Sequence, residues 1–156
     1  MLTRLDAKGQ QTNDTYDIYG RLTLTQRVTY YYDSAPATPG PNQFWTLPYG
    51  CCSNTAGRLA AVQFANSNSN AGTFGIDVQQ LFYLYSYNQA GRVTMQDLRV
   101  AGGGQYVPTV DFTASYKWDN MGRMTEMDYP LNGPKVAMNY DAMSNLSSET
   151  EATCQT

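Results

Sequence analysis

The sequence predicts an all-β fold in which consecutive antiparallel β-hairpins form a curved sheet. A short phrase recurs along the 156 residues: an aromatic residue, Asp or Asn, two variable positions, Gly, Arg, an aliphatic residue and Thr. Polar and apolar residues alternate between the copies, as they do in strands with one buried face. Thr, Tyr and Val are plentiful, whereas Glu and Lys, which favour helices, occur three times each. A repeated hairpin accounts for all three observations.

Three copies of the phrase match at every defined position, in units at residues 16–24, 87–95 and 118–125. An Asp or Asn that opens a four-residue turn accepts a hydrogen bond from a nearby backbone N–H, and Gly takes the left-handed conformation that follows. A type I turn of this kind, with a bulge, closes a hairpin. We therefore expect a hairpin tip at each unit. The turn residues are Tyr16, Asp17, Gly20 and Arg21; Tyr87, Asn88, Gly91 and Arg92; and Trp118, Asp119, Gly122 and Arg123.

Three further copies are incomplete, and we expect the same turn in each. They retain Asn54, Gly57 and Arg58 in a unit at 53–60, Tyr140 and Asp141 in a unit at 140–147, and Asp6 and Gly9 in a partial unit at 5–12. Ser53 stands at the aromatic position, while Ser144 and Asn145 stand where the other units have Gly and Arg. The spacing between neighbouring copies varies from 11 to 37 residues, so the turn is fixed and the spacer is not.

The segments beside the turns have the pattern of half-buried strands. Apolar residues alternate with polar ones from Val110 to Trp118, and again from Val136 to Tyr140. Two insertions interrupt the pattern. Residues 33–50 contain four of the seven prolines, which cannot donate to a sheet ladder, and residues 65–75 are a small polar tract typical of a loop. Neither marks a domain boundary, so we predict a single repeat segment over residues 1–156.

Composition and charge exclude several classes of function. With 42% hydrophobic and 13% aromatic residues the chain is too apolar for a disordered segment. The net charge of −3 provides no basic surface for nucleic acid, and four of the ten Lys and Arg residues lie at turn positions. The chain has no run of 18 apolar residues and no signal-peptide pattern at its start. We therefore expect neither nucleic-acid binding nor membrane insertion.

The residues that carry chemistry favour a structural use. The absence of His removes Ser-His and Cys-His catalysis and the commonest transition-metal ligand. Several of the Asp residues already have a turn role, so we predict no catalytic, cofactor or metal site. Cys51 and Cys52 are adjacent, and with Cys154 they make three cysteines, too few for a disulfide framework or a zinc site. We expect Cys51 and Cys52 to be loop thiols, with a vicinal disulfide as the alternative.

The thirteen tyrosines admit two interpretations. Tyr83, Tyr85 and Tyr87 alternate along one predicted strand and would form a platform for sugar rings or cross-strand pairs that hold a sheet together. We favour the cross-strand pairs. If an aromatic residue binds a ligand, Trp45 is the better candidate, because insertions on a rigid scaffold are common recognition sites.

The phrase YDIYGRLT at residues 16–23 resembles the YD repeat of the RHS (rearrangement hotspot) family of bacterial polymorphic toxins and wall-associated proteins, with the animal teneurins more distant. The resemblance recurs over residues 5–147. It implies hairpins joined edge to edge into a sheet that spirals into a hollow shell, which in the toxins encloses a C-terminal toxic domain. That core often ends in a self-cleavage segment similar to DPxGxxDPxG. The stretch DYPLNGP at 128–134 lacks this pattern, so neither self-cleavage nor a toxin domain is carried over.

The resemblance implies a non-enzymatic wall module within a larger secreted or cell-surface protein, needing no cofactor. Its expected partners are the rest of the repeat shell and an enclosed toxin domain. The pattern is cut at both ends, which is typical of a piece of a longer array. The alternative is a cell-surface module that binds carbohydrate or a receptor through its insertions.

Overall fold

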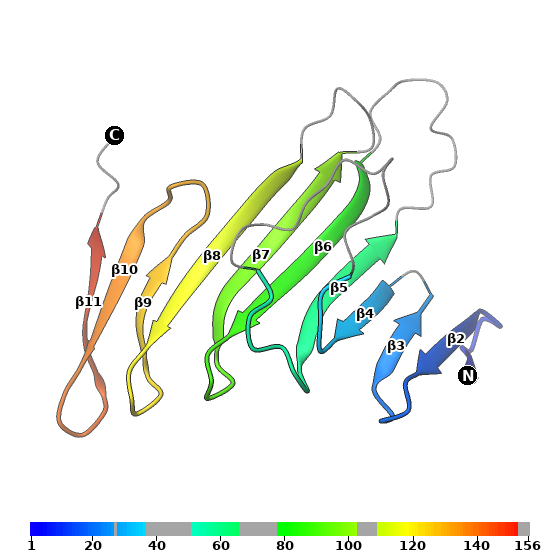
Figure 1. Cartoon of the computed structure of the whole chain (residues 1–156), viewed down its shortest axis with the longest axis horizontal. Helices are drawn as coiled ribbons and strands as arrows, with labels where there is room; N and C mark the ends of the chain where they lie inside the picture. The colour runs from blue at the N-terminus through cyan, green and yellow to red at the C-terminus, as the bar shows by residue number, and fades with distance from the viewer. Residues whose placement is uncertain (27, 37–50, 66–77, 103–108, 153–156) are drawn as a thin grey trace.

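The computed structural model describes residues 1–26, 28–36, 51–65, 78–102 and 109–152. These residues form one open antiparallel sheet in which every strand pairs with its neighbours in sequence (Figure 1). The all-β prediction of consecutive hairpins is confirmed. The strands are β1 (Leu2–Leu5), β2 (Gln11–Tyr16), β3 (Leu22–Thr25), β4 (Val28–Tyr32), β5 (Leu59–Ala65), β6 (Val78–Tyr87), β7 (Val93–Gly102), β8 (Val110–Trp118), β9 (Met124–Asp128), β10 (Lys135–Tyr140) and β11 (Leu146–Ala152).

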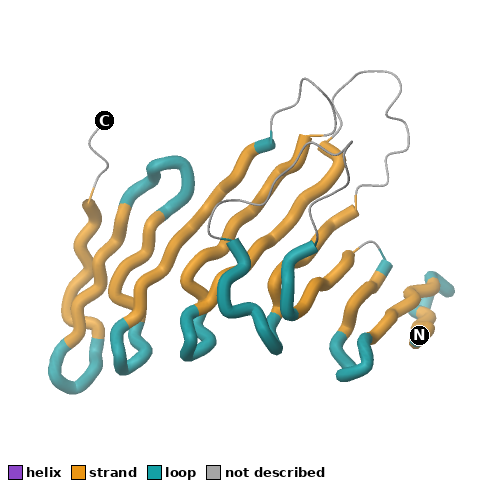
Figure 2. Tube along the Cα trace, in the orientation of Figure 1, coloured by secondary structure: helices purple, strands orange, loops and turns teal. Residues whose placement is uncertain are grey.

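Because consecutive strands run in opposite directions, the turns alternate between the two edges of the sheet (Figure 2). The turns after β2, β4, β6, β8 and β10 all lie at one edge, which we call the turn edge; it is the lower edge in Figure 2. The turn at Asp6 and Gly9 follows β1 and lies at the opposite edge. The partial unit at 5–12 is therefore out of phase with the others, because one strand rather than two separates it from the next unit.

All five turns at the turn edge share one irregularity. The pairing shifts by one residue beside the aromatic position, as at a β-bulge, and the residue at the Gly position has a positive φ. The extra residue lets a type I turn connect two strands of normal twist. The pairs next to the shift are Tyr16–Leu22, Tyr32–Leu59, Tyr87–Val93, Trp118–Met124 and Tyr140–Leu146.

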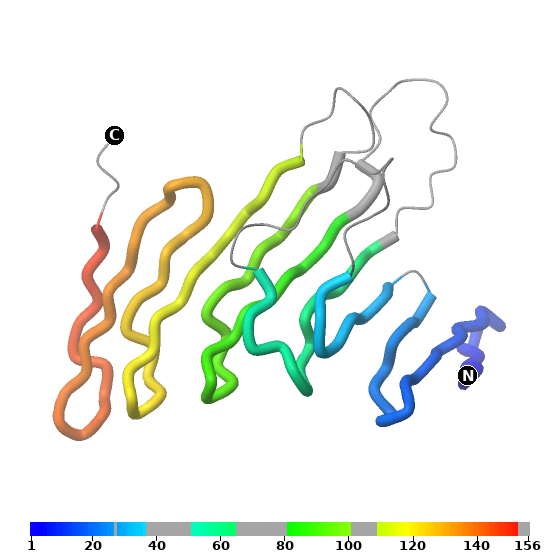
Figure 3. Tube along the Cα trace, in the orientation of Figure 1, coloured from blue at the N-terminus to red at the C-terminus, as the bar shows by residue number. Residues whose placement is uncertain are grey.

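Strand alternation gives the sheet two different faces. Tyr83 pairs with Leu98 and Tyr85 with Gln96 on one face, which we call the tyrosine face. Phe82 and Leu84 lie on the other face, the core face, where they are almost fully buried together with Ala61. Tyr31 and residues 51–52 pack against this cluster. Figure 3 shows the segment after residue 50 running across the sheet beside β5 and β6.

Both predicted insertions fall mainly outside the described residues. The segment 33–50 lies between β4 and β5, inside a turn rather than in a spacer, and only residues 33–36 of it are described. The tract at 65–75 connects β5 to β6, and Trp45 and Cys154 are also outside the described part of the chain. Among the described residues no helix is long and apolar enough to cross a membrane.

Candidate functional site

The turn at Asp17 shows how a complete unit is held. The Asp17 N–H donates to the Arg21 carbonyl at 3.0 Å, and the Gly20 N–H donates to the Asp17 carbonyl at 3.1 Å. The Asp17 carboxylate accepts the backbone N–H groups of Tyr19 and Arg21 at 2.9 Å each, and the Arg21 Nε at 2.6 Å. Desolvation raises the pKa of Asp17, but these hydrogen bonds outweigh it and hold the pKa below its ordinary value. The Asp is thus committed to the turn.

The other turns repeat this arrangement with one or two changes. Asp119 accepts from the Arg123 N–H and Nε, and Asp141 accepts from the Asn145 N–H; these bonds lower the pKa of both carboxyls. Asn88 accepts the Arg92 N–H at 2.9 Å. Asp6 makes the same pattern at the opposite edge, with the N–H groups of residues 8 and 10. The turn chemistry is local, since it depends on residues within four positions of each other.

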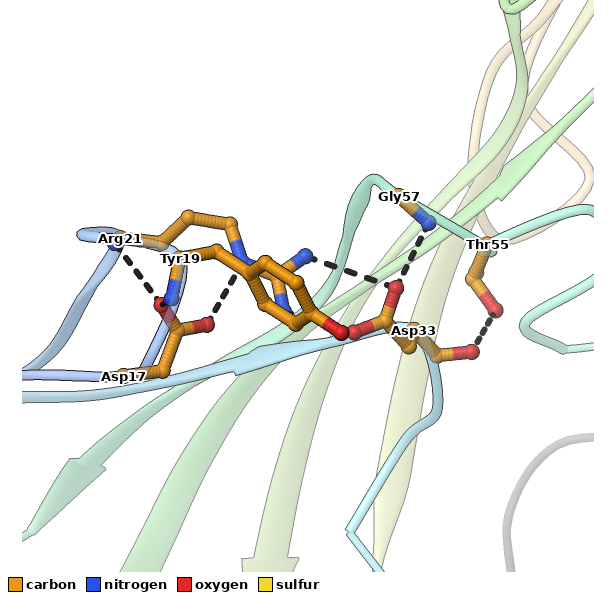
Figure 4. A network of polar contacts seen from close by, with 6 residues as sticks. All are labelled: Asp17, Tyr19, Arg21, Asp33, Thr55 and Gly57. Carbon is orange, nitrogen blue, oxygen red and sulfur yellow. Dashed lines mark hydrogen bonds and ion pairs between the residues drawn. The ribbon is translucent and has the colours of Figure 1, made fainter.

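The unit predicted at 53–60 is wrong at its first position. Asp33, not Asn54, takes the part that Asp17 has: its N–H donates to the Arg58 carbonyl at 3.0 Å, and its carboxylate accepts the Gly57 N–H at 2.6 Å (Figure 4). Asn54 instead donates through its side chain to the Tyr87 carbonyl at 2.8 Å. The aromatic position is held by Tyr32, which pairs with the residue after Arg58. We call this the split unit, because residues 34–56 separate its Tyr-Asp half from its Gly-Arg half.

Asp33 also connects the split unit to the unit before it. Arg21 Nη2 lies 2.7 Å from Asp33 Oδ2, while Thr55 Oγ1 donates to the Asp33 carbonyl at 2.7 Å (Figure 4). The Arg21 side chain and the Gly57 N–H lower the pKa of the Asp33 carboxyl, and Asp33 and Asp17 together raise the pKa of Arg21. The Asp33 carboxylate therefore joins three segments: the turn at Asp17–Arg21, the end of β4 and the residues just before β5.

Residues 53–54, which lie inside the split unit, dock on the start of the next unit. The Tyr87 N–H donates to the Ser53 carbonyl at 3.0 Å, and the Ser53 N–H donates to Ser86 Oγ at 3.2 Å. Together with the Asn54 side chain, these bonds fasten residues 53–54 to the end of β6. The stretch just before Gly57 is therefore part of the contact between neighbouring units.

Cys51 and Cys52 are joined by a disulfide, so our expectation of two loop thiols is wrong. Both residues pack against the buried cluster of Ala61, Phe82 and Leu84 on the core face. Such an apolar surface suits a disulfide, which has no S–H donor that needs a partner. The disulfide thus covers part of the apolar cluster at the centre of the sheet.

A second regular feature connects each unit at the turn edge to the next. The arginine of each unit lies over the aromatic ring of the following unit, and we call this series the arginine ladder. Its four contacts are Arg21 over Tyr32 at 4.4 Å, Arg58 over Tyr87 at 5.6 Å, Arg92 over Trp118 at 5.8 Å and Arg123 over Tyr140 at 4.7 Å, each measured to the ring centre. Contacts of this geometry are cation–π interactions, which are favourable at partly exposed sites.

The aromatic side chains reinforce the ladder with hydrogen bonds in the opposite direction. Tyr87 donates its hydroxyl to the Leu59 carbonyl at 2.8 Å, the Trp118 indole donates to the Val93 carbonyl at 2.7 Å, and Tyr140 donates to the Met124 carbonyl at 2.7 Å. In each case the acceptor is the residue after the arginine of the preceding unit.

The residue at the Gly position also contacts this arginine. A Cβ at Gly122 would overlap the Arg92 guanidinium, and one at Gly91 would lie 3.1 Å from Arg58 Nη2. In the last unit Ser144 replaces Gly and accepts a hydrogen bond from Arg123 Nη1 at 3.1 Å. At Gly91 and Gly122 the position thus has two requirements, a left-handed backbone and room for the neighbouring guanidinium, whereas a Cβ at Gly57 would have no atom within 4 Å.

The core face of β7 to β10 carries a polar patch beyond the cluster covered by residues 51–52. Asp97 is fully buried, accepts the Thr113 hydroxyl at 2.5 Å, and has no hydrogen-bond partner for Oδ2 among the described residues. Burial raises the pKa of the Asp97 carboxyl, with a smaller contribution from Asp111. Arg99 makes a two-pronged pair with Asp111, with both contacts at 2.6 Å.

Further along the same face, Glu126 lies between Lys117 at 2.7 Å and Lys135 at 3.1 Å, and these two lysines lower the pKa of Glu126. These contacts commit Asp111 and Glu126 to cross-strand ion pairs. Within the described residues no group of three or more His, Cys, Asp or Glu side chains has a metal-binding arrangement.

A shallow pocket of about 530 Å³ adjoins the polar patch where β9 turns into β10. Lys135 lies 3.4 Å from Asp128 Oδ1, a buried oxygen that has no hydrogen-bond partner among the described residues. Tyr129 is 44% exposed at the side of this turn. The pocket thus offers acceptors, a cation and an aromatic ring. Its lining is Asp111, Thr113, Asp128, Tyr129, Leu131, Asn132, Gly133 and Lys135.

The sequence pattern located most of these turns but missed Tyr32, Asp33, the polar patch and the pocket. Tyr32-Asp33 is a Tyr-Asp pair without a Gly-Arg, and Gly57-Arg58 is a Gly-Arg without an aromatic residue. Joining these two halves would have identified the split unit. The patch had no such indication, because its members are single residues on different strands.

No protein-family model matches the chain, and a search of curated proteins finds no match.

Proposed function

We propose that this chain is a non-enzymatic wall module, a segment of sheet built to be continued by further hairpins of the same kind. The observation that carries the proposal is the arginine ladder. Four units supply a cation to the next unit's ring, and three of these four receive a hydrogen bond from that ring, so neighbouring units stabilise each other. Repeat proteins in which each unit contacts only its neighbours are stabilised in this way.

The two outermost strands of the sheet, β1 and β11, support the same proposal. Every residue of β1 and β11 is exposed, and each strand pairs with a described strand on one side only. Unpaired strand edges are templates for further pairing. The resemblance to YD repeats extends the proposal: the module belongs to the wall of a shell in a larger secreted or cell-surface protein, and the shell encloses a C-terminal toxin domain.

Edge association tests the wall proposal. Analytical ultracentrifugation of the chain from micromolar to millimolar concentration should show association that increases with concentration. A variant with Ser148→Lys and Thr150→Lys places charges on exposed positions of β11 and should associate less, since edge lysines oppose strand pairing. A chain that stays monomeric over the whole range would contradict the proposal.

A second function, binding of a carbohydrate, is favoured by the pocket beside β9 and β10. The partly exposed Lys135 ammonium would donate to a sugar hydroxyl, and the exposed Tyr129 ring offers a stacking surface. The pocket volume lies within the range of small-molecule sites.

A glycan array tests this second function. Specific binding should disappear in Tyr129→Ala and Asn132→Ala, which alter the pocket lining. Tyr19→Ala is the matched control, because Tyr19 is 75% exposed at the turn edge and does not line the pocket. Binding that is unchanged by the pocket variants, or no binding at all, would reject this site.

A further inference from the structure

The arginine ladder has one aromatic ring without its arginine. Tyr32, Tyr87, Trp118 and Tyr140 each lie beneath the arginine of the preceding unit. Tyr16 has the same place in the first unit of the turn edge, yet it is 46% exposed, and within the described residues no guanidinium lies over its ring. Tyr16 is therefore a ring position of the ladder that the described residues leave unoccupied.

Strand register shows where the missing cation belongs. In the four hairpins of the ladder, continuing the observed strand pairing toward the turn edge places each arginine directly opposite its aromatic residue. The pairs that set this register are Thr25–Val28, Ala61–Leu84, Met95–Ser115 and Ala137–Glu126. Strands β1 and β2 pair in the same manner, with Leu2 opposite Asp14. Continuing this register places the position opposite Tyr16 one residue before Met1. The strand frame thus fixes the position that an arginine would need.

The single cation of β1, Arg4, is already engaged. Arg4 is paired with the buried Asp14 at 2.7 Å. A second copy of this chain whose β11 paired with β1 would not supply an arginine either, because its strands would lie opposite β1 and not opposite Tyr16. The occupant is therefore an arginine on the β1 frame itself, at the end of a Gly-Arg turn that precedes β1.

We propose that Tyr16 is the docking site for the arginine guanidinium of the preceding unit of the wall, which the β1 frame places opposite Tyr16. This inference rests on the proposed wall function and names the partner at one side of the module. The guanidinium stacks on the Tyr16 ring as Arg21 stacks on Tyr32. At the other side of the module, Asn145 stands at the arginine position of the last unit, so this unit offers no guanidinium to the aromatic ring of a following unit.

The test uses the full chain extended by Gly-Arg before Met1, with Gly-Gln as the matched extension. Urea unfolding should show the folding equilibrium constant about two- to five-fold larger for the Gly-Arg protein, the size of an exposed cation–π contact. In the Tyr16→Leu background the two extensions should be equal. A gain that persists in Tyr16→Leu would reflect general attraction to the net negative chain and would overturn the inference, as would equal stability in the Tyr16 background.

A second readout does not depend on the Tyr16→Leu protein folding. In the Gly-Arg protein, the side-chain proton resonances of the added arginine should move upfield, because the protons lie over the Tyr16 ring. Random-coil shifts for these protons would overturn the inference. Since both measurements follow a contact within one chain, their failure is distinguishable from a failure of the edge-association test, which follows oligomers.

Discussion

Gly122 lies directly beneath the guanidinium of Arg92, the arginine of the preceding unit, so closely that a Cβ at this position would overlap it. Gly20 has a similar φ, +76° against +85°, but no atom lies within 4 Å of where its Cβ would be. The two glycines therefore separate the cost of a left-handed backbone from the cost of blocking the ladder.

Gly20→Ala should lower the free energy of unfolding by about 1–2 kcal/mol, the usual penalty for a left-handed residue with a Cβ. Gly122→Ala should lower it by more, because the methyl group also displaces Arg92 from Trp118. Urea melts of both variants measure the difference. Removing the guanidinium with Arg92→Ala should abolish the excess cost at Gly122. Equal losses at the two glycines would mean that Arg92 does not occupy this position.

The split unit predicts that Asp33 matters more than Asn54. Asp33→Ala removes the acceptor for Gly57 and for Arg21, whereas Asn54→Ala removes one hydrogen bond to the Tyr87 carbonyl. Asp33→Ala should therefore shift the urea midpoint further, and part of its effect should weaken at high salt because an ion pair is lost. A larger shift of the urea midpoint for Asn54→Ala would contradict the split unit and support the unit at 53–60 that the sequence predicted.

The sequence predicted the turns well because their hydrogen bonds are local. An Asp at the first position and a left-handed residue three positions later are sufficient, which is why even Asp141 with Ser144 adopts the turn. The phrase failed at Asn54 because residues 34–56 separate Asp33 from its Gly57 partner. Local spacing does not indicate an insertion inside a turn.

The ladder and the polar patch depend on strand register, which joins residues far apart in the sequence. Arg92 meets Trp118, and Asp97 meets Thr113, only because β7 and β8 pair in one frame. The alternation of polar and apolar residues predicts which face a residue occupies. It does not predict which cross-strand neighbour the residue meets.

The Cys51–Cys52 disulfide makes a chemical prediction. In the oxidised protein, neither cysteine should react with iodoacetamide, and the peptide that contains both should be two hydrogens lighter than its reduced form. Reduction should also lower the urea midpoint, because the residues that cover Phe82 and Leu84 become less constrained. Alkylation of both cysteines in unreduced protein would show that they are free thiols.

Asp97 should make the protein less stable as the pH rises. Because burial raises the pKa of Asp97 in the folded state, its favourable contribution is complete below the unfolded value near 3.8 and is lost as the pH rises through the folded value. Asp97→Asn resembles the protonated carboxyl and still accepts from Thr113, so at pH 7 it should be more stable than the wild type.

The difference in unfolding free energy between Asp97→Asn and the wild type should approach zero below about pH 3.8. The turn carboxyls, whose pKa values are lowered, stabilise both proteins above pH 4 and lose this effect equally on acidification, so they cancel in the difference. A difference that does not change between pH 3 and pH 7 would contradict the raised pKa of Asp97.

The most direct test of the wall account is a pair of double-mutant cycles measured by urea unfolding. Arg92→Gln combined with Trp118→Leu should give a coupling free energy of about 0.5–1 kcal/mol, because the two side chains are in cation–π contact. Arg92→Gln combined with Tyr140→Leu should give a coupling within about 0.3 kcal/mol of zero, since Tyr140 belongs to the unit after next and receives Arg123 instead. Coupling in the first cycle alone is the result that the arginine ladder predicts; no coupling in the first cycle, or equal coupling in both, would contradict it.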